Sequence, residues 1–241
     1  MPAHTTDKSA VRDAATLIVL RDRHSTPRIL MGQRGAKAAF MPNKFVFPGG
    51  ALDAGDAHVP TATPLPDPCA TRLLNATDAT VASGLPATAI RELWEETGLR
   101  LGKHGTWPAP VPDDWADFAT TGVLPDAGAL QFVFRALTPP GRPRRFDARF
   151  FLVDATAIQD DLDDFSAASD ELSHLQWVPL EDARRFDMPF ITEVVLAEVQ
   201  SRLANTAPPD SVPYFRNDEE ASLFLRLYGK PQADHNAGSG D

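Results

Sequence analysis

Residues 91–99 read Arg-Glu-Leu-Trp-Glu-Glu-Thr-Gly-Leu, and they decide the interpretation of the whole chain. They belong to the segment 87–99, whose apolar residues recur at helical spacing and which ends at a glycine. On a helix, Glu92, Glu95 and Glu96 share one face because they are separated by three and four residues. Like charges repel at this spacing, so a hard cation such as Mg²⁺ is a physical reason to gather them. A solvated acidic helix face is the alternative for an isolated stretch of this kind.

A second informative stretch lies upstream, where residues 45–50 read Phe-Val-Phe-Pro-Gly-Gly. The pattern predicts a short strand over 45–47 that proline and two glycines stop. Glycine permits backbone conformations that other residues resist, so we expect an unusual turn at Gly49 and Gly50.

Together the two stretches resemble the Nudix box. Residues 91–99 match its Arg-Glu-U-x-Glu-Glu-x-Gly-U half at every defined position, U being a bulky apolar residue. Residues 47–50 are the usual lead-in, and Asp56 stands where the box has glutamate. The family pattern would place the arginine at position 64, whereas it stands at 91, so the box contains an insertion of 27 residues. We expect residues 57–84 to loop out of the domain.

Within that superfamily the chain resembles the branch of the CoA and acyl-CoA diphosphatases. The likeness rests on the insertion, on residues 40–53 and on residues 138–139 and 145–151, and it covers about 14–203. It implies an α/β Nudix fold, an α/β/α sandwich around a mixed β-sheet. It also implies an enzyme that cuts a diphosphate linkage with Mg²⁺ or Mn²⁺, converting CoA or acyl-CoA to 3′,5′-ADP and a 4′-phosphopantetheine derivative.

Two other functions stay open. One is a broader hydrolase acting on a nucleotide sugar, a dinucleotide or a nucleoside triphosphate. The other is a non-catalytic Nudix module that binds a nucleotide and regulates another protein. The complete set of glutamates counts against the second, since a degenerate module commonly loses them.

The resemblance also assigns the metal ligands. Glu95 and Glu96 are expected to be the principal ligands of the cation, which takes oxygen donors. Glu92 is either a further ligand or the carboxylate that orients the attacking water. The backbone carbonyl of Gly50 is expected to ligate the metal, although a Gly-Gly pair is in general most often just a turn.

Further residues are expected to support the reaction. Arg91 holds the glutamates in place, because a guanidinium pairs with carboxylates in a planar geometry, with a plain surface salt bridge as the alternative. Glu171 serves as the general base or an extra ligand, or is a solvated loop acid. Asp56 ties down the glycine turn without contacting substrate. Arg34 and Arg145 are candidates for binding substrate phosphates, and each could instead be an ordinary surface residue.

The remaining sequence predicts one Nudix domain over 13–228, between a flexible N-terminus (1–12) and a flexible C-terminal tail (229–241). Strands are predicted over 14–20, 28–33, 130–137, 149–153 and 172–178, and helices over 179–186, 191–205 and 219–227, with a short helix within 69–82. The proline-rich stretch 102–126 is predicted to form a lid that shapes the substrate entrance with residues 57–84. Its Trp107 and Trp115 either stack on a base or, as we favour, anchor the loop in the core. Helix 191–205 either pairs subunits in a homodimer or only covers the sheet.

Composition narrows the classes of partner. The formal net charge of -10 counts against a nucleic acid polymer as a ligand, and a small-molecule diphosphate is the expected one. No apolar run approaches the roughly 20 residues needed to span a bilayer, so no membrane partner is expected. Cys69 is the single cysteine, so it cannot form an internal disulfide and any metal must sit on oxygen ligands. The cytoplasm is the expected compartment.

Overall fold

We analysed a computed structural model of the chain, which describes residues 10–38, 40–217 and 221–228. The strands are β1 (Val11–Arg21), β2 (Arg28–Arg34), β3 (Phe45–Val46), β4 (Gly49–Ala51), β5 (Gly102–His104), β6 (Val123–Pro125), β7 (Gln131–Leu137), β8 (Arg145–Asp154), β9 (Leu172–Pro179), β10 (Val212–Asn217) and β11 (Ser222–Leu227). The helices are α1 (Cys69–Leu73), α2 (Ala79–Thr97), α3 (Ala116–Thr120) and α4 (Phe190–Ser201), with short 3-10 turns η1 (Asp56–His58), η2 (Asp113–Trp115), η3 (Ala155–Ala157) and η4 (Ala183–Arg185).

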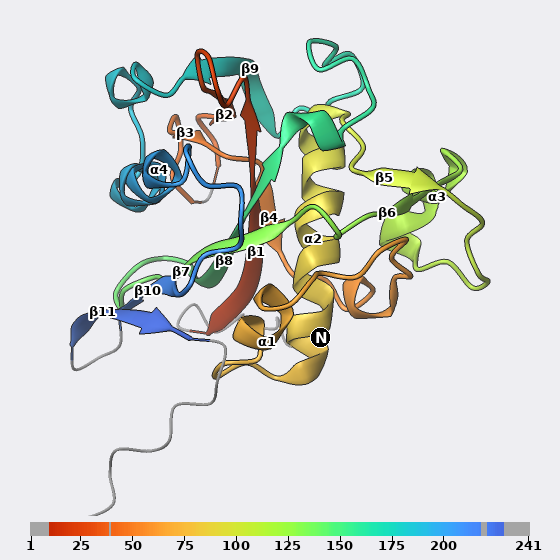
Figure 1. Cartoon of the computed structure of the whole chain (residues 1–241), viewed down its shortest axis with the longest axis horizontal. Helices are drawn as coiled ribbons and strands as arrows, with labels where there is room; N and C mark the ends of the chain where they lie inside the picture. Colours follow the sequence, from red (N-terminus) through yellow and green to blue (C-terminus); the bar gives the residue numbers. More distant parts are fainter. Residues whose placement is uncertain (1–9, 39, 218–220, 229–241) are drawn as a thin grey trace, which may run out of the picture.

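A mixed sheet forms the centre of the molecule, in the order β11-β10-β7-β8-β1-β2-β3 (Figure 1). β1 runs parallel to β8 along almost its whole length, and its other edge is shared. β4 pairs with the first part of that edge, at residues 14–16, and β2 pairs with its end, at residues 20–21. The split edge brings the Gly49-Gly50 turn beside the middle of the sheet.

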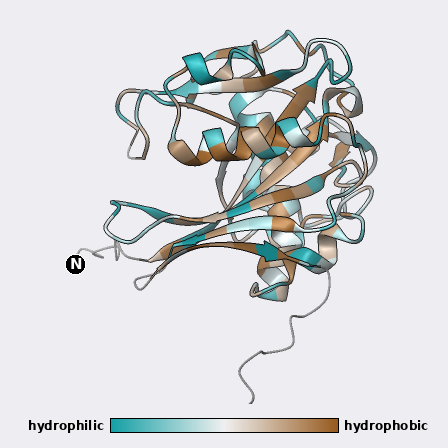
Figure 2. Cartoon of the chain, turned by 60° about the vertical axis from the view of Figure 1, so that its left-hand side comes forward, coloured by the Kyte–Doolittle hydropathy of each residue, from teal (hydrophilic) through white to brown (hydrophobic). Residues whose placement is uncertain are grey.

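Strand periodicity explains how the sheet is covered on both faces. Leu17 and Val19 of β1 belong to the core that contains α2, whereas Ile18 and Leu20 belong to the core that contains α4. All four side chains are fully buried, as period-2 alternation in a doubly covered sheet requires. α2 and α4 flank the sheet, and apolar residues follow the strands and the helix faces turned toward them (Figures 1 and 2). The predicted α/β/α sandwich around a mixed sheet is confirmed.

The first half of the predicted elements is largely correct, but the carboxylate helix begins earlier than expected. α2 starts at Ala79 and not at 87, because the Asp78 side chain accepts a hydrogen bond from the Thr80 N–H (2.8 Å) and so caps the helix. The helix continues through Pro86, which removes only one intrahelical bond. Residues 57–84 are therefore not one loop, since they contain part of η1, all of α1 and the first turns of α2. β1 likewise begins at Val11, inside the expected N-terminal segment.

Three predicted helices in the second half need correction. The segment 179–186 contains the last residue of β9 and the short turn η4 but no α-helix, and α4 ends at Ser201 and not at 205. The helix expected over 219–227 is wrong within its described residues, because these form β11, which pairs antiparallel with β10. Leu223, Phe224 and Leu225 are consecutive apolar residues, so local periodicity does not identify this strand, and its pairing with β10 does. Residues 219 and 220 of that prediction, most of the N-terminal segment and the tail 229–241 lie outside the described residues.

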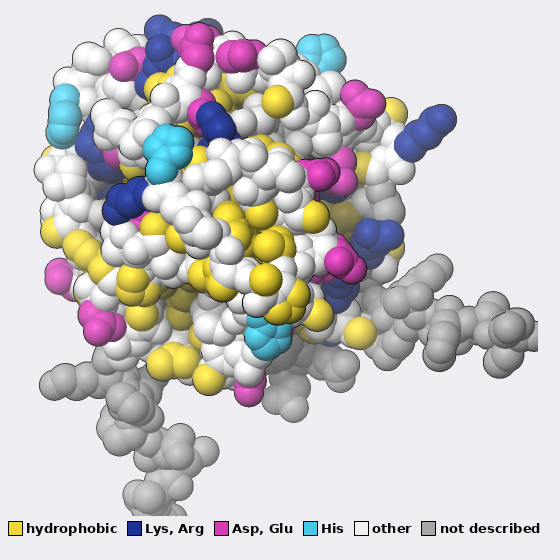
Figure 3. Space-filling model, turned by 90° about the vertical axis from the view of Figure 1, so that its right-hand side faces the viewer, with side chains coloured by type: hydrophobic (Ala, Val, Ile, Leu, Met, Phe, Trp, Pro, Cys, Tyr) yellow, Lys and Arg dark blue, Asp and Glu magenta, His cyan; other side chains and the backbone are white. Residues whose placement is uncertain are grey.

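The lid segment, residues 102–126, is ordered as a small unit and not as an irregular loop. β5 and β6 pair antiparallel, and η2 and α3 lie between them in the chain. Trp115 and Phe118 are fully buried, with ring centroids 5.2 Å apart, and Phe118 also packs edge-on against Trp94 of α2. The anchoring role favoured for Trp115 is confirmed. On the side of the molecule that carries this segment, hydrophobic side chains gather at the centre, with charged ones around them (Figure 3).

Within the described ranges, every helix is too short or too polar to cross a membrane.

Candidate functional site

The site begins with α2, whose faces have different environments. Ile90 and Leu93 point into the core, and both are fully buried. Glu92 and Glu96 are also buried, while the Glu95 side chain remains 36% exposed. The helix ends at Gly98, which has a φ of 80° and donates its N–H to the Trp94 carbonyl (2.7 Å). Glycine adopts this left-handed conformation without strain, which explains the sequence at this end of the helix.

The Gly49-Gly50 turn meets the carboxylates at very close range. The Gly49 N–H donates to Glu96 Oε2 at 2.8 Å. A Cβ atom built on Gly50 would overlap the Glu92 carboxylate, and one built on Gly49 would overlap the backbone of β1 at Thr16. Only glycine therefore permits this approach, and the unusual turn predicted from the sequence has a physical cause.

Arg91 is the centre of the carboxylate cluster and is almost fully buried. Its Nη1 lies 3.0 Å from both Glu92 Oε1 and Glu95 Oε2. Its Nη2 donates to the Ala51 carbonyl (3.1 Å), which ties α2 to the end of β4. Burial alone would lower the pKa of Arg91, but the hydrogen bond to Asp56 and the charges of the neighbouring carboxylates raise it, so the guanidinium stays charged. The structure thus brings Arg91 and the glutamates together, and a plain surface salt bridge is excluded.

Asp56 lies behind Arg91, buried to 1% exposure. Its two oxygens accept hydrogen bonds from Arg91 Nε and Nη2, both at 3.1 Å, in a bidentate pair. Thr88 Oγ1 of α2 also donates to Asp56 Oδ2, at 2.7 Å. Asp56 is therefore fixed beneath the cluster and acts on the glycine turn through Arg91.

Burial dominates the electrostatics of the three glutamates. It raises the pKa of Glu92 to about 7, against the opposing charge of Arg91, and it raises the pKa of Glu95 as well. The pKa of Glu96 is raised well above its usual range by burial and by the nearby charge of Glu92. Three carboxylates that resist ionisation side by side form a site where a bound cation would be stabilising.

The donor set fits a hard divalent cation. It consists of carboxylate oxygens beside a backbone turn, which are the ligands Mg²⁺ and Mn²⁺ prefer. Among the described residues, no three acidic, His or Cys side chains already surround one point as a ready-made cage. Arg91 and the Gly49 N–H engage the glutamate oxygens in this arrangement. Cation binding would therefore redirect oxygens that are already close together.

Glu171 approaches the cluster from the loop before β9. Its charge contributes to the raised pKa values of all three glutamates, so it lies within electrostatic reach of them. The loop is held to α2 by the Ser169 N–H, which donates to the Glu95 carbonyl at 2.9 Å. Glu171 itself is exposed, so its carboxylate is open to solvent.

The two candidate arginines differ in position. Arg34, at the end of β2, lies close enough to Glu96 for its charge to oppose the raised pKa of that carboxyl. Its Nε is buried without a hydrogen-bond partner among the described residues. Arg145 instead begins β8 and donates to the Thr138 carbonyl at 3.2 Å. The structure therefore brings Arg34 to the carboxylates and does not bring Arg145 there.

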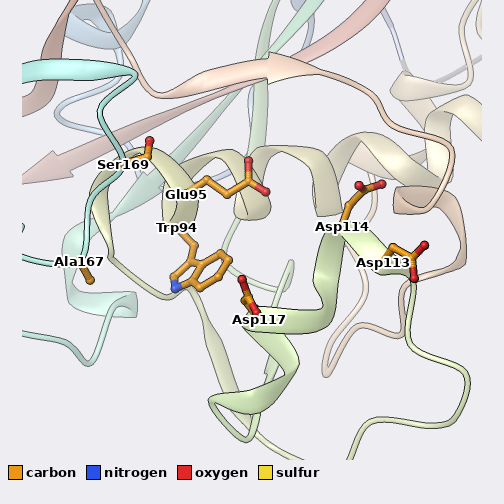
Figure 4. A pocket seen from close by; sticks show the side chains of 7 residues that line it. All are labelled: Trp94, Glu95, Asp113, Asp114, Asp117, Ala167 and Ser169. Atoms are coloured by element: carbon orange, nitrogen blue, oxygen red, sulfur yellow. The ribbon is translucent and has the colours of Figure 1, made fainter.

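A cavity of about 270 Å³ opens beside the carboxylate cluster (Figure 4). It is lined by Trp94, Glu95, Asp113, Asp114, Asp117, Ala167 and Ser169. Glu95 projects from α2 on one side, and the three aspartates come from η2 and α3 of the lid segment. The lid segment therefore lines a depression next to the site, whereas residues 57–84, which were expected to shape the entrance with it, contribute nothing to the lining of this cavity.

Sequence reasoning missed several residues of this region. Thr88 could have been found, since it lies three residues before Arg91 on the same face of the helix. No local sequence pattern marks Asp53 or the aspartates of the cavity as site residues. The Asp53 carboxylate lies 3.3 Å from Arg91 Nη2. Their positions depend on how the loops fold against α2.

Comparisons with known proteins agree with this geometry. No family model matches the chain. A Caenorhabditis elegans protein that carries the name nudix hydrolase 7 is 29% identical over 181 residues, which are 70% of this chain and 52% of that protein. An acyl-coenzyme A diphosphatase of Gallus gallus is 32% identical over 178 residues, covering 52% of this chain and 47% of that protein. The chain thus spans about half the length of the curated relatives it matches.

A solved structure supports the fold directly. The crystal structure of a NUDIX hydrolase from Alicyclobacillus acidocaldarius is 28% identical and superposes with a TM-score of 0.59. The match covers 82% of this chain and 97% of that one. The sequence similarity and the shared fold together identify the chain as a relative of the Nudix hydrolases.

Proposed function

We propose that the protein is a Mg²⁺- or Mn²⁺-dependent hydrolase that cleaves a diphosphate linkage. One observation carries the proposal, which is the cluster of Glu92, Glu95 and Glu96 packed against the Gly49-Gly50 turn, with Arg91 as the cation that Glu92 and Glu95 share. The cluster holds more negative charge than Arg91 balances. A substrate rich in phosphate oxygens and a divalent cation complement each other at such a site.

The residues have distinct roles in this proposal. Glu95, Glu96 and the Gly50 carbonyl hold the metal, and Glu92 either joins them or orients water. A bound divalent cation screens the diphosphate charge and lowers the pKa of water. Arg91 and Asp56 keep the glutamates in place, as their bidentate pair indicates.

Two residues outside the helix complete the proposed reaction. Glu171 takes a proton from the attacking water, since its carboxylate is solvent-exposed and within electrostatic reach of the cluster. Arg34 binds a substrate phosphate, which would give its buried, unpartnered Nε an acceptor.

CoA or an acyl-CoA is the proposed substrate, cut to 3′,5′-ADP and a 4′-phosphopantetheine derivative. The support is the insertion within the Nudix box and the similarity to the Gallus gallus protein, which is named an acyl-coenzyme A diphosphatase. That similarity covers only 52% of this chain, so the substrate has to be tested separately from the chemistry.

A mass-spectrometric product assay tests both levels. Purified protein is incubated with CoA, acetyl-CoA, NADH, ADP-ribose and nucleoside triphosphates, with Mg²⁺ or Mn²⁺. Glu95→Gln and Glu96→Gln are the site variants, and Glu181→Gln, at an exposed position after β9, is the matched control. We expect 3′,5′-ADP from the CoA compounds with the wild type and the control only. Rapid cleavage of another diphosphate with CoA left intact would reject the substrate and keep the site, whereas no cleavage of any compound would reject the enzyme.

A further inference from the structure

Trp115 reaches from the lid segment into the base of the carboxylate cluster. It ends η2 and is fully buried, and its Nε1–H donates to Asp56 Oδ1 at 2.8 Å. A buried indole N–H needs an acceptor, and for Trp115 that acceptor is a carboxylate of a distant segment. The contact therefore links two regions that are 59 residues apart in the chain.

Asp56 accepts five hydrogen bonds, and Trp115 donates one of the two that reach Oδ1. Oδ1 is shared by Arg91 Nε and the indole, while Oδ2 accepts from Arg91 Nη2, Thr88 Oγ1 and the Asp53 N–H. A buried carboxylate keeps a single orientation when all its lone pairs are used. Removing the indole N–H would leave Oδ1 with Arg91 as its only partner.

The orientation of Asp56 is passed on to the glutamates through one rigid group. The guanidinium of Arg91 is planar, so fixing Nε and Nη2 against Asp56 also fixes Nη1. Nη1 is the atom that contacts both Glu92 and Glu95, at 3.0 Å each. A rotation of Arg91 would therefore displace two of the proposed metal-binding carboxylates together.

We propose that Trp115 is a positioning residue, which acts through Asp56 and Arg91 to hold Glu92 and Glu95 in the orientation that binds the metal. The inference rests on the function proposed above. It also couples the lid segment to the site, since the same segment supplies Asp113, Asp114 and Asp117 to the cavity that Glu95 lines. An ordered lid and an ordered metal site then occur together.

Trp107 provides a matched control within the same aromatic cluster. Its ring lies 5.7 Å from that of Trp115 and 6.2 Å from that of Phe118. Its Nε1–H donates to the Val123 carbonyl at 2.7 Å, which is a backbone group of the lid segment itself. Replacing either tryptophan with phenylalanine removes one indole N–H and keeps an aromatic ring, but only the Trp115 bond leads to Asp56.

The experiment compares Trp115→Phe and Trp107→Phe with the wild type. Metal-free protein is titrated with Mn²⁺ and free Mn²⁺ is followed by electron paramagnetic resonance, and kcat and KM are measured for the substrate found in the product assay. Melting temperatures show whether the two variants lose similar stability. We expect Trp115→Phe to weaken Mn²⁺ binding and lower kcat, each by about tenfold, with little change in KM, as loss of one hydrogen bond to a charged group predicts. Trp107→Phe should change both by less than about twofold.

Equal Mn²⁺ affinities in the two variants would overturn the positioning role and leave the proposed function standing. A wild-type protein that binds no Mn²⁺ would overturn both. Because Mn²⁺ binding is measured without substrate, the test of Trp115 does not depend on finding the right diphosphate.

Discussion

Two of the networks that form around buried arginines among the described residues differ in charge balance. The sheet network consists of Arg135, Arg149, Asp13 and Asp147, and the helix network consists of Arg91, Asp53, Asp56, Glu92 and Glu95. The first holds two guanidiniums and two carboxylates, whereas the second holds one guanidinium and four carboxylates. Buried charges are stable when paired, and the first network pairs its charges within the chain. In the second, Asp56 and Glu92 are buried while Asp53 and Glu95 are partly exposed, and the excess of carboxylates is the reason for proposing a further cation there.

The sheet network has a structural task. Arg135 pairs with Asp147 through two bonds of 2.9 and 2.6 Å and also donates to the carbonyls of Asn75 and Ala76. Arg149 adds a bond to Thr77 Oγ1. These contacts attach the turn before α2 to the sheet, so they fix where the carboxylate helix begins.

The helix network lies in the C-terminal half of α2, whereas the sheet network contacts the turn before this helix. Glu96 is a further acid beside the helix network. The sheet network is balanced in charge and the helix network has an excess of carboxylates, and this difference distinguishes two networks built from similar parts. Burial of an arginine cluster is by itself no indication of function, while an excess of buried carboxylates is.

The largest effect is expected from Glu96→Gln, which removes the acid beside the helix network while keeping the shape of the side chain. Turnover should fall to roughly one-thousandth of the wild-type value. Loss of a residue that only hydrogen-bonds a metal ligand typically costs about 10–100-fold, and loss of a proposed ligand itself should cost more. The measurement is product release at saturating Mg²⁺, with Glu181→Gln as the control. Turnover within about threefold of wild type would show that the excess charge has no catalytic task.

Arg135→Met tests the opposite network. It leaves Asp147 buried with only the longer contact to Arg149, at 3.4 Å, so the free energy of unfolding should fall by about 3 kcal/mol. Urea denaturation measures this loss. Mn²⁺ affinity and turnover of the folded variant should stay within about twofold of wild type. If metal binding fell together with stability, the two networks would not be separable in function.

A third effect concerns pH, and it belongs to the helix network of the metal-free protein. The pKa of Glu92 is about 7 in the folded state, against 4.5 as its ordinary value, so the folded state holds its proton more tightly. The free energy of unfolding should therefore fall as pH rises from about 4.5 to about 7, by about 3 kcal/mol for this group.

Urea denaturation in the presence of EDTA, repeated from pH 4.5 to pH 8, checks this slope. Glu92→Gln should be less dependent on pH than the wild type, and added Mg²⁺ should stabilise the wild type more at pH 8 than at pH 5. A wild-type protein whose stability rose over this window would contradict the expected role of Glu92.

The smallest effect is expected at Arg34, which lies at the margin of the cluster. Arg34→Ala should raise KM by about tenfold and change kcat little, as removal of one charge-assisted contact to a substrate phosphate would do. Steady-state kinetics on the identified substrate measures the split, with Arg28→Ala at the exposed start of β2 as the control. A fall in kcat at constant KM would instead indicate that Arg34 acts on Glu96.

Some of the helices and strands can be predicted from the local sequence, and others cannot. The strands over 14–20, 28–33 and 172–178 and the helix through Glu92 follow from local periodicity, and they are present. The final strand is not predictable in this way, because its assignment depends on pairing with β10, which a single short segment does not reveal. The early start of α2 is not predicted, because Pro86 favours a helix that begins after it and not at the Asp78 cap.

The site divides in the same way. Three glutamates at helical spacing are a local pattern, and so is the glycine turn. The contacts of Asp56 with Arg91 and Trp115 join residues 35 and 59 positions apart. The balance of charge in either network likewise arises only when the chain folds, so local sequence patterns do not predict it.

The most direct test of the central claim is a calorimetric titration of metal-free protein with Mn²⁺. We predict saturable binding by the wild type and by Arg135→Met, and affinity at least about tenfold weaker in Glu96→Gln. Equal affinity in wild type and Glu96→Gln, or no binding by the wild type, would contradict the claim that the excess carboxylates are there to hold a cation.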